Sequence, residues 1–111
     1  MSSTENAIVV DLNDKPEYQR VFEGPPQTGG MKVGRVHLEA DNACGEHSTK
    51  EKEEILVFLA GQGELLIGEE KEPLAVGAGR VAYIRPQTIH DVRNTGSEPL
   101  IYIFCVSPPA V

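Results

Sequence analysis

The sequence predicts an all-β protein, with short antiparallel strands arranged as a sandwich or barrel. Eleven glycines and eight prolines are spread through the 111 residues. No long stretch has apolar residues at the three-to-four spacing of an amphipathic helix. Between the turn-forming residues, short apolar runs recur roughly eight times, a pattern typical of small β-sandwiches and barrels.

In the first half of the chain, turn residues separate three predicted strands. The first two lie on either side of the turn-prone Asn13–Pro16, and the third follows a loop rich in glycine and proline. In the third strand, Arg35 and His37 alternate with Val36 and Leu38, which leaves open which of its faces points inward. These strands are expected at 7–12, 19–23 and 31–40.

The second half contains shorter apolar runs. Gly61-Gln62-Gly63 separates the first two of them, Pro86 interrupts the chain further on, and Thr95-Gly96 precedes the last run. The charged stretch 50–54 that comes before these runs is typical of a solvated loop. The predicted strands are 55–60, 64–67, 80–84, 90–93 and 100–106.

Length, charge and cysteine content limit the function. The length predicts one domain, 1–111, with its core at about 31–107 and N-terminal strands and a loop at 1–30. Seventeen acidic against ten basic residues give a charge of −7, which argues against nucleic acid and membrane surfaces as partners. The first fifteen residues lack the pattern of a signal peptide, so we expect a cytoplasmic protein in which Cys44 and Cys105 are reduced.

Two spaced patterns contain residues suited to metal chemistry. In the first, His47 is followed by Thr49, Glu54 and Gly61. In the second, Gly79 is followed after ten residues by His90 and then, after three more, by Asn94. Strand alternation places Glu54 on the face of Leu56 and Phe58, and His90 on that of Val92 and Asn94, so both candidates should point inward.

These patterns resemble the two motifs of the cupin family, and the resemblance covers roughly 33–106. It implies a small antiparallel jelly roll, or double-stranded β-helix barrel, with a pocket between its sheets. Four departures from the motifs are visible. Asp41 and Gln87 stand where the family has glycine, Pro86 is one residue late, and Thr49 replaces the second histidine of the first motif.

The resemblance implies that His47, Glu54 and His90 bind a divalent transition metal: Fe, Mn, Ni or Zn. Two imidazoles and one carboxylate match the facial triad of non-haem iron proteins and leave positions open for other ligands. Each donor atom should then lie about 2.0 to 2.3 Å from the metal. Thr49 instead can hold a water or a substrate hydroxyl. His37 is a possible replacement ligand, and Cys44 is either a soft ligand or a small buried filler.

Besides Thr49, three residues are candidates for substrate contacts: Arg35, Tyr83 and Tyr102. Arginine binds carboxylates through two hydrogen bonds. The phenol of a tyrosine can donate a proton or a hydrogen bond. The family implies oxygenase, isomerase or lyase chemistry on a small polar molecule. The alternatives are a non-catalytic sugar- or effector-binding module with a degenerate metal site and, ranked last, a purely structural role. We also expect a homodimer in which segment 7–12 pairs with a second copy, because edge strands need cover.

Overall fold

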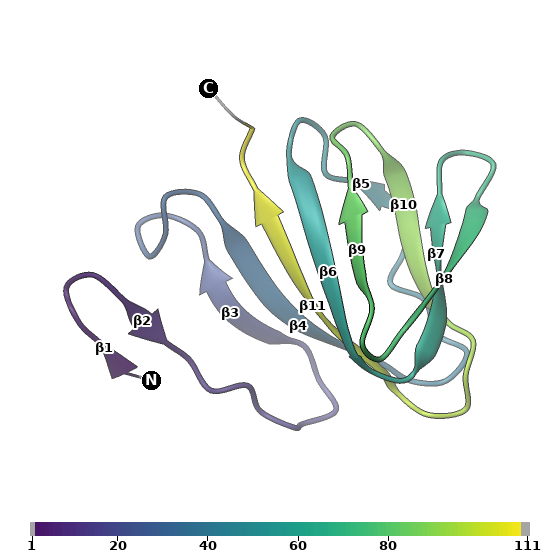
Figure 1. The fold of residues 1–111 in the computed structure, drawn as a ribbon, viewed down its shortest axis with the longest axis horizontal. Helices are drawn as coiled ribbons and strands as arrows, with labels where there is room; N and C mark the ends of the chain where they lie inside the picture. Colours follow the sequence, from purple (N-terminus) through teal and green to yellow (C-terminus); the bar gives the residue numbers. More distant parts are fainter. Residues whose placement is uncertain (1, 110–111) are drawn as a thin grey trace.

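The protein folds into two antiparallel sheets that face each other, with a small N-terminal hairpin beside them (Figure 1). A computed structural model describes residues 2–109. Over this range all regular structure is β, as the sequence predicted, and no helix is present that could cross a membrane. The strands are β1 (Ser2–Ser3), β2 (Ile8–Val9), β3 (Gln19–Glu23), β4 (Lys32–Leu38), β5 (His47–Ser48), β6 (Glu53–Ala60), β7 (Gln62–Ile67), β8 (Glu72–Gly77), β9 (Val81–Ile84), β10 (Ile89–Asn94) and β11 (Leu100–Ser107).

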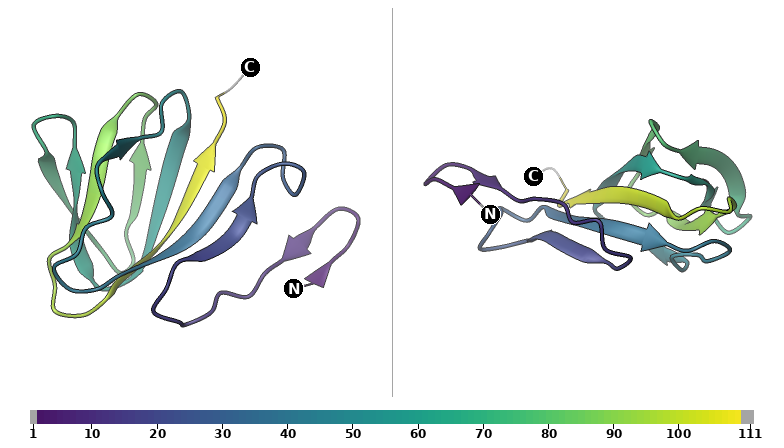
Figure 2. Two further views of the ribbon diagram at one scale, coloured as in Figure 1. Left: turned by 180° about the vertical axis from the view of Figure 1, so that it is seen from behind. Right: turned by 90° about the horizontal axis from the view of Figure 1, so that it is seen from below.

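The strand order shows how distant segments meet. One sheet has the order β3-β4-β11-β6-β9 and the other has the order β5-β10-β7-β8. The chain crosses from one sheet to the other repeatedly, so β6 and β10, which carry the two motifs, lie in opposite sheets. Figure 2 shows the curvature of the two sheets around the space between them.

The core lies between the sheets and follows the alternation expected from the sequence. In β6, Leu56 and Phe58 are 2% and 1% exposed, whereas Ile55, Val57 and Leu59 between and beyond them are 36% to 47% exposed. The other core side chains come from both sheets and include Leu38, Leu65, Val76, Ile84, Val92, Leu100 and Tyr102. In β4, the face that carries Val36 and Leu38 points into the core.

Four strands, β1, β2, β5 and β8, differ from the expectation. The first predicted strand, 7–12, is reduced to Ile8–Val9, which pairs with Ser2–Ser3 in a hairpin that projects from the body (Figures 1 and 2). Strand β5 lies where no strand was expected, just before the charged stretch 50–54. That stretch was expected to be a solvated loop, but β6 begins at Glu53, and Glu54 is only 5% exposed. Strand β8 was missed because Pro73 interrupts its pattern; it is an edge strand, where the lack of an N–H donor is tolerated.

Gly61, between β6 and β7, is required by its backbone conformation and by its neighbours. Its φ is +87°, and a Cβ there would lie 2.4 Å from the Pro99 carbonyl oxygen. We expect Gly61→Ala to lower the free energy of unfolding by about 2 to 4 kcal/mol, because strain and overlap add. Gly68 is the matched control: its φ is +78° but its Cβ would meet nothing within 4 Å. Gly68→Ala should cost only about 1 kcal/mol. Urea unfolding measures both, and equal losses would contradict the role of close packing at Gly61.

The homodimer stays a prediction. The outer face of β6 exposes Ile55, Val57 and Leu59, and apolar groups that gather on a surface favour self-association. β2 is paired on one side with β1 of its own chain, so any pairing with a second copy would use its other edge. We expect light scattering at micromolar concentration to give the mass of a dimer, and a monomeric mass would contradict this.

Candidate metal centre

His47, Glu54 and His90 come together at one end of the space between the sheets. One donor atom from each lies within 4.8 Å of the others. Glu54 enters from β6, His90 from β10 in the opposite sheet, and His47 from the short β5. β5 pairs with β10 so that His47 lies directly opposite His90, and their ring centroids are 4.3 Å apart. The three residues that the motif spacing selected therefore share one site.

Both imidazole rings are oriented through their Nδ1 atoms. His47 Nδ1 donates to the Gly45 carbonyl over 2.7 Å, and His90 Nδ1 donates to the Thr88 carbonyl over 3.0 Å. A carbonyl oxygen only accepts, so in the neutral rings the proton is on Nδ1 and the lone pair is on Nε2. A histidine that binds metal through Nε2 needs this tautomer.

The Glu54 carboxylate is the least satisfied polar group of the site. Glu54 is 5% exposed, and among the described residues its Oε1 has no hydrogen-bond partner, although His90 Nε2 lies only 3.0 Å away. A lone pair and a carboxylate oxygen at this distance repel each other unless a proton or a cation lies between them. This orphaned oxygen fits a metal ion held by both groups.

The surroundings of His90 favour its protonated, positively charged form. Burial lowers the pKa of His90, but the Glu54 carboxylate and the Thr88 carbonyl outweigh burial, and the pKa is raised. A bound metal would have to displace this proton, so metal affinity should fall as the pH drops through the raised pKa.

The departures from the cupin motifs leave the local backbone intact. Asp41 and Gln87, which stand in place of glycine, have φ values of +68° and +59°. This left-handed conformation is the one that glycine adopts readily. Thr49 contributes to the lining of the pocket at the site, and its hydroxyl donates to the Lys52 carbonyl over 2.8 Å.

The other residues considered from the sequence lie in different places. The Tyr102 side chain is in the pocket, whose lining also includes Cys44. Tyr83 lies outside this pocket, half exposed, and donates to Glu53 over 2.8 Å. Its side chain alternates with the inward-facing Ile84 and so points away from the space between the sheets.

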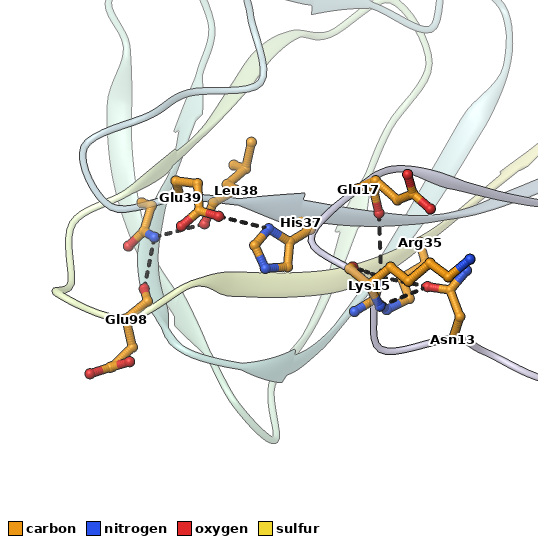
Figure 3. Close-up of polar contacts among 9 residues, drawn as sticks. Asn13, Lys15, Glu17, Arg35, His37, Leu38, Glu39 and Glu98 are labelled. Atoms are coloured by element: carbon orange, nitrogen blue, oxygen red, sulfur yellow. Dashed lines mark hydrogen bonds and ion pairs between the residues drawn. The ribbon is translucent and has the colours of Figure 1, made fainter.

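Arg35 and His37 share the outer face of β4, as Figure 3 shows. Arg35 is only 3% exposed, because its guanidinium donates to the carbonyls of Lys15 and Glu17 and to Asn13. It is a structural anchor for the N-terminal segment and does not line the pocket. His37 contributes to the pocket lining but its Nδ1 is 3.7 Å from Glu39, outside the group of three donors, so the hypothesis that it replaces the missing ligand is wrong.

Asp91 supports the site from the far side of β10, a role that no motif or spacing in the sequence indicates. Its Oδ1 accepts from the Gly45 N–H over 2.8 Å, and the Gly45 carbonyl orients His47. We expect Asp91→Ala to weaken metal binding about tenfold, the usual loss for such supporting contacts. Asp91→Asn keeps an acceptor oxygen and should restore most of the affinity. Competition against a chelator measures all three proteins, and unchanged affinity in Asp91→Ala would contradict the role.

The comparisons with known proteins agree with this geometry. The family model described as the cupin domain matches residues 34–106, from β4 to β11. The chain belongs to the cupin family. Its fold, a double-stranded β-helix, is thus confirmed.

Three similar proteins place this cupin among its relatives. A double-stranded β-helix protein of Klebsiella pneumoniae has 24% identity and a TM-score of 0.74, over 90% of this chain and 83% of that one. A predicted oxalate decarboxylase of Thermotoga maritima has 17% identity and a TM-score of 0.68, over 90% and 99%. Glucose-6-phosphate isomerase of Pyrococcus abyssi is 35% identical over 60 residues, which are 51% of this chain and 32% of that protein. The match thus spans about a third of the isomerase's length.

Proposed function

We propose that this cupin binds one divalent transition metal through His47, Glu54 and His90 and that its pocket takes up a small molecule. The orphaned Oε1 of Glu54 carries the proposal, since a buried carboxylate oxygen beside an imidazole lone pair calls for a cation. The donor set, two nitrogens and one oxygen, suits Fe, Mn, Ni or Zn. When bound, such an ion supplies Lewis-acid or redox chemistry at the oxygen atoms of a ligand.

The chain itself supplies the shape and orientation of the site. The carbonyls of Gly45 and Thr88 fix the two rings, and the apolar walls around Leu56 and Val92 limit access of water. With three protein ligands, coordination positions remain for a bound molecule. Oxygenase, isomerase or lyase chemistry in the cytoplasm is the activity we assign to this arrangement.

Metal analysis tests the proposal. Protein purified without a histidine tag should contain about one equivalent of a single transition metal by mass spectrometry, and chelation should remove it. Reloading should stabilise the protein against heat. If the protein binds none of the four ions, the proposed metal site is overturned.

A non-catalytic binding module is the second candidate. The specific observation in its favour is Thr49, which leaves the site one ligand short of the family pattern and whose hydroxyl donates to the chain's own backbone. This candidate predicts that a small molecule stabilises the metal-loaded protein without being converted. Product detected by chromatography after incubation would decide for the enzyme.

A further inference from the structure

The pocket around the candidate metal centre has one polar end and apolar walls. Its volume is about 440 Å³, within the range of small-molecule sites. The group of three donors forms the polar end. The walls are formed by aliphatic and aromatic side chains: Val36, Leu38, Leu56, Val92, Phe104 and Val106. A ligand that fills this space has to cover mostly apolar surface.

The described lining contains neither lysine nor arginine. Three arginines outside this pocket are already engaged: Arg35 with the N-terminal segment, Arg93 with Glu64 over 2.8 Å, and Arg85 over the ring of Tyr83. Proteins that recognise phosphate generally place such cations, above all arginine, against it. The chain's charge of −7 adds to the unfavourable field for an anion.

Two further polar groups on the wall, the Tyr102 phenol and the Cys44 thiol, are neutral. Burial raises the pKa of the Tyr102 phenol and of the Cys44 thiol. Both groups thus stay uncharged at neutral pH. They add polarity to one place on the wall without supplying a charge for a second ionic contact.

We propose that the pocket takes an uncharged molecule with an apolar body and two adjacent oxygen atoms at one end, such as a diol or hydroxyketone, and that it rejects phosphorylated sugars. The assignment of the oxygen end rests on the proposed metal function. The assignment of the apolar, uncharged body rests on the walls alone. This class differs from the phosphosugar named for the isomerase relative.

The test compares two probes by calorimetric titration of the zinc-loaded protein. 4-Methylcatechol is neutral at pH 7 and carries two adjacent oxygens on an apolar ring, whereas glucose 6-phosphate is polar and anionic. We expect 4-methylcatechol to bind at least tenfold more tightly. Equal or tighter binding of glucose 6-phosphate would overturn the proposal.

Titration of the metal-free protein tests the ligand class separately from the metal function. If the protein takes up none of Fe, Mn, Ni and Zn, the metal function fails, and preference for 4-methylcatechol in the metal-free protein still supports the apolar, uncharged ligand class. If zinc binds but glucose 6-phosphate is preferred, the metal function stands and the ligand class is overturned.

A matched pair of variants tests whether the lack of a positively charged side chain on the lining disfavours phosphate. Ala43 is exposed and lies on the pocket lining, and Ala75 is exposed on β8, outside this pocket. Ala43→Arg should raise the affinity for glucose 6-phosphate at least tenfold, whereas Ala75→Arg should leave it unchanged. Equal effects of the two substitutions would overturn the argument from the uncharged lining.

Discussion

Replacement of His90 with alanine is expected to reduce bound metal to below about a tenth of an equivalent, because two protein donors hold a divalent ion poorly. His90 is 2% exposed and its Nε2 lies 3.0 Å from Glu54, so the substitution also removes the group that faces the buried carboxylate. Metal content after equal loading is measured by mass spectrometry.

His37→Ala is the matched control, since His37 lies outside the group of three donors and should leave metal content unchanged. Should His90→Ala fail to fold, His47→Ala removes an exposed ligand at little cost to the core and tests the same site. Wild-type metal content in folded His47→Ala and His90→Ala would show that the motif is a relic of the fold.

The Thr49→His substitution is expected to act in the opposite direction and tighten metal binding about tenfold or more, by adding a fourth ligand. Thr49 lies on the pocket lining, two residues beyond His47 and therefore on the same side of the extended chain. The substitution gives up the hydrogen bond to the Lys52 carbonyl, a loss of about 1 kcal/mol in the free energy of unfolding.

Thr49→Ala is the control that separates these two effects, because it loses the same hydrogen bond without gaining a ligand. Chelator competition gives the dissociation constants of the three proteins. An affinity of Thr49→His no higher than that of Thr49→Ala would contradict the prediction, and would show that the loop before β6 cannot bring a side chain to the site.

The inward-facing residues of the two strands that carry the motifs follow from the residue pattern alone. Alternation placed Glu54 with Leu56 in β6 and His90 with Val92 in β10, and the structure buries all four. Period-two alternation is a local property of extended chain, so it can be recognised without knowledge of the partner strands. The turn character expected of Asp41 and Gln87 is local in the same way, and both have positive φ values.

What each of these faces contacts depends instead on packing between distant segments of the chain. The pairing of β5 with β10 brings His47 opposite His90, and the cover given by Lys15 and Glu17 buries Arg35 on the outer side of β4. The same holds for Asp91, which reaches Gly45 across 46 positions of sequence. Strand pairing and loop packing join segments far apart in the chain, and their partners are backbone groups that every residue carries, so no residue pattern along the sequence marks them.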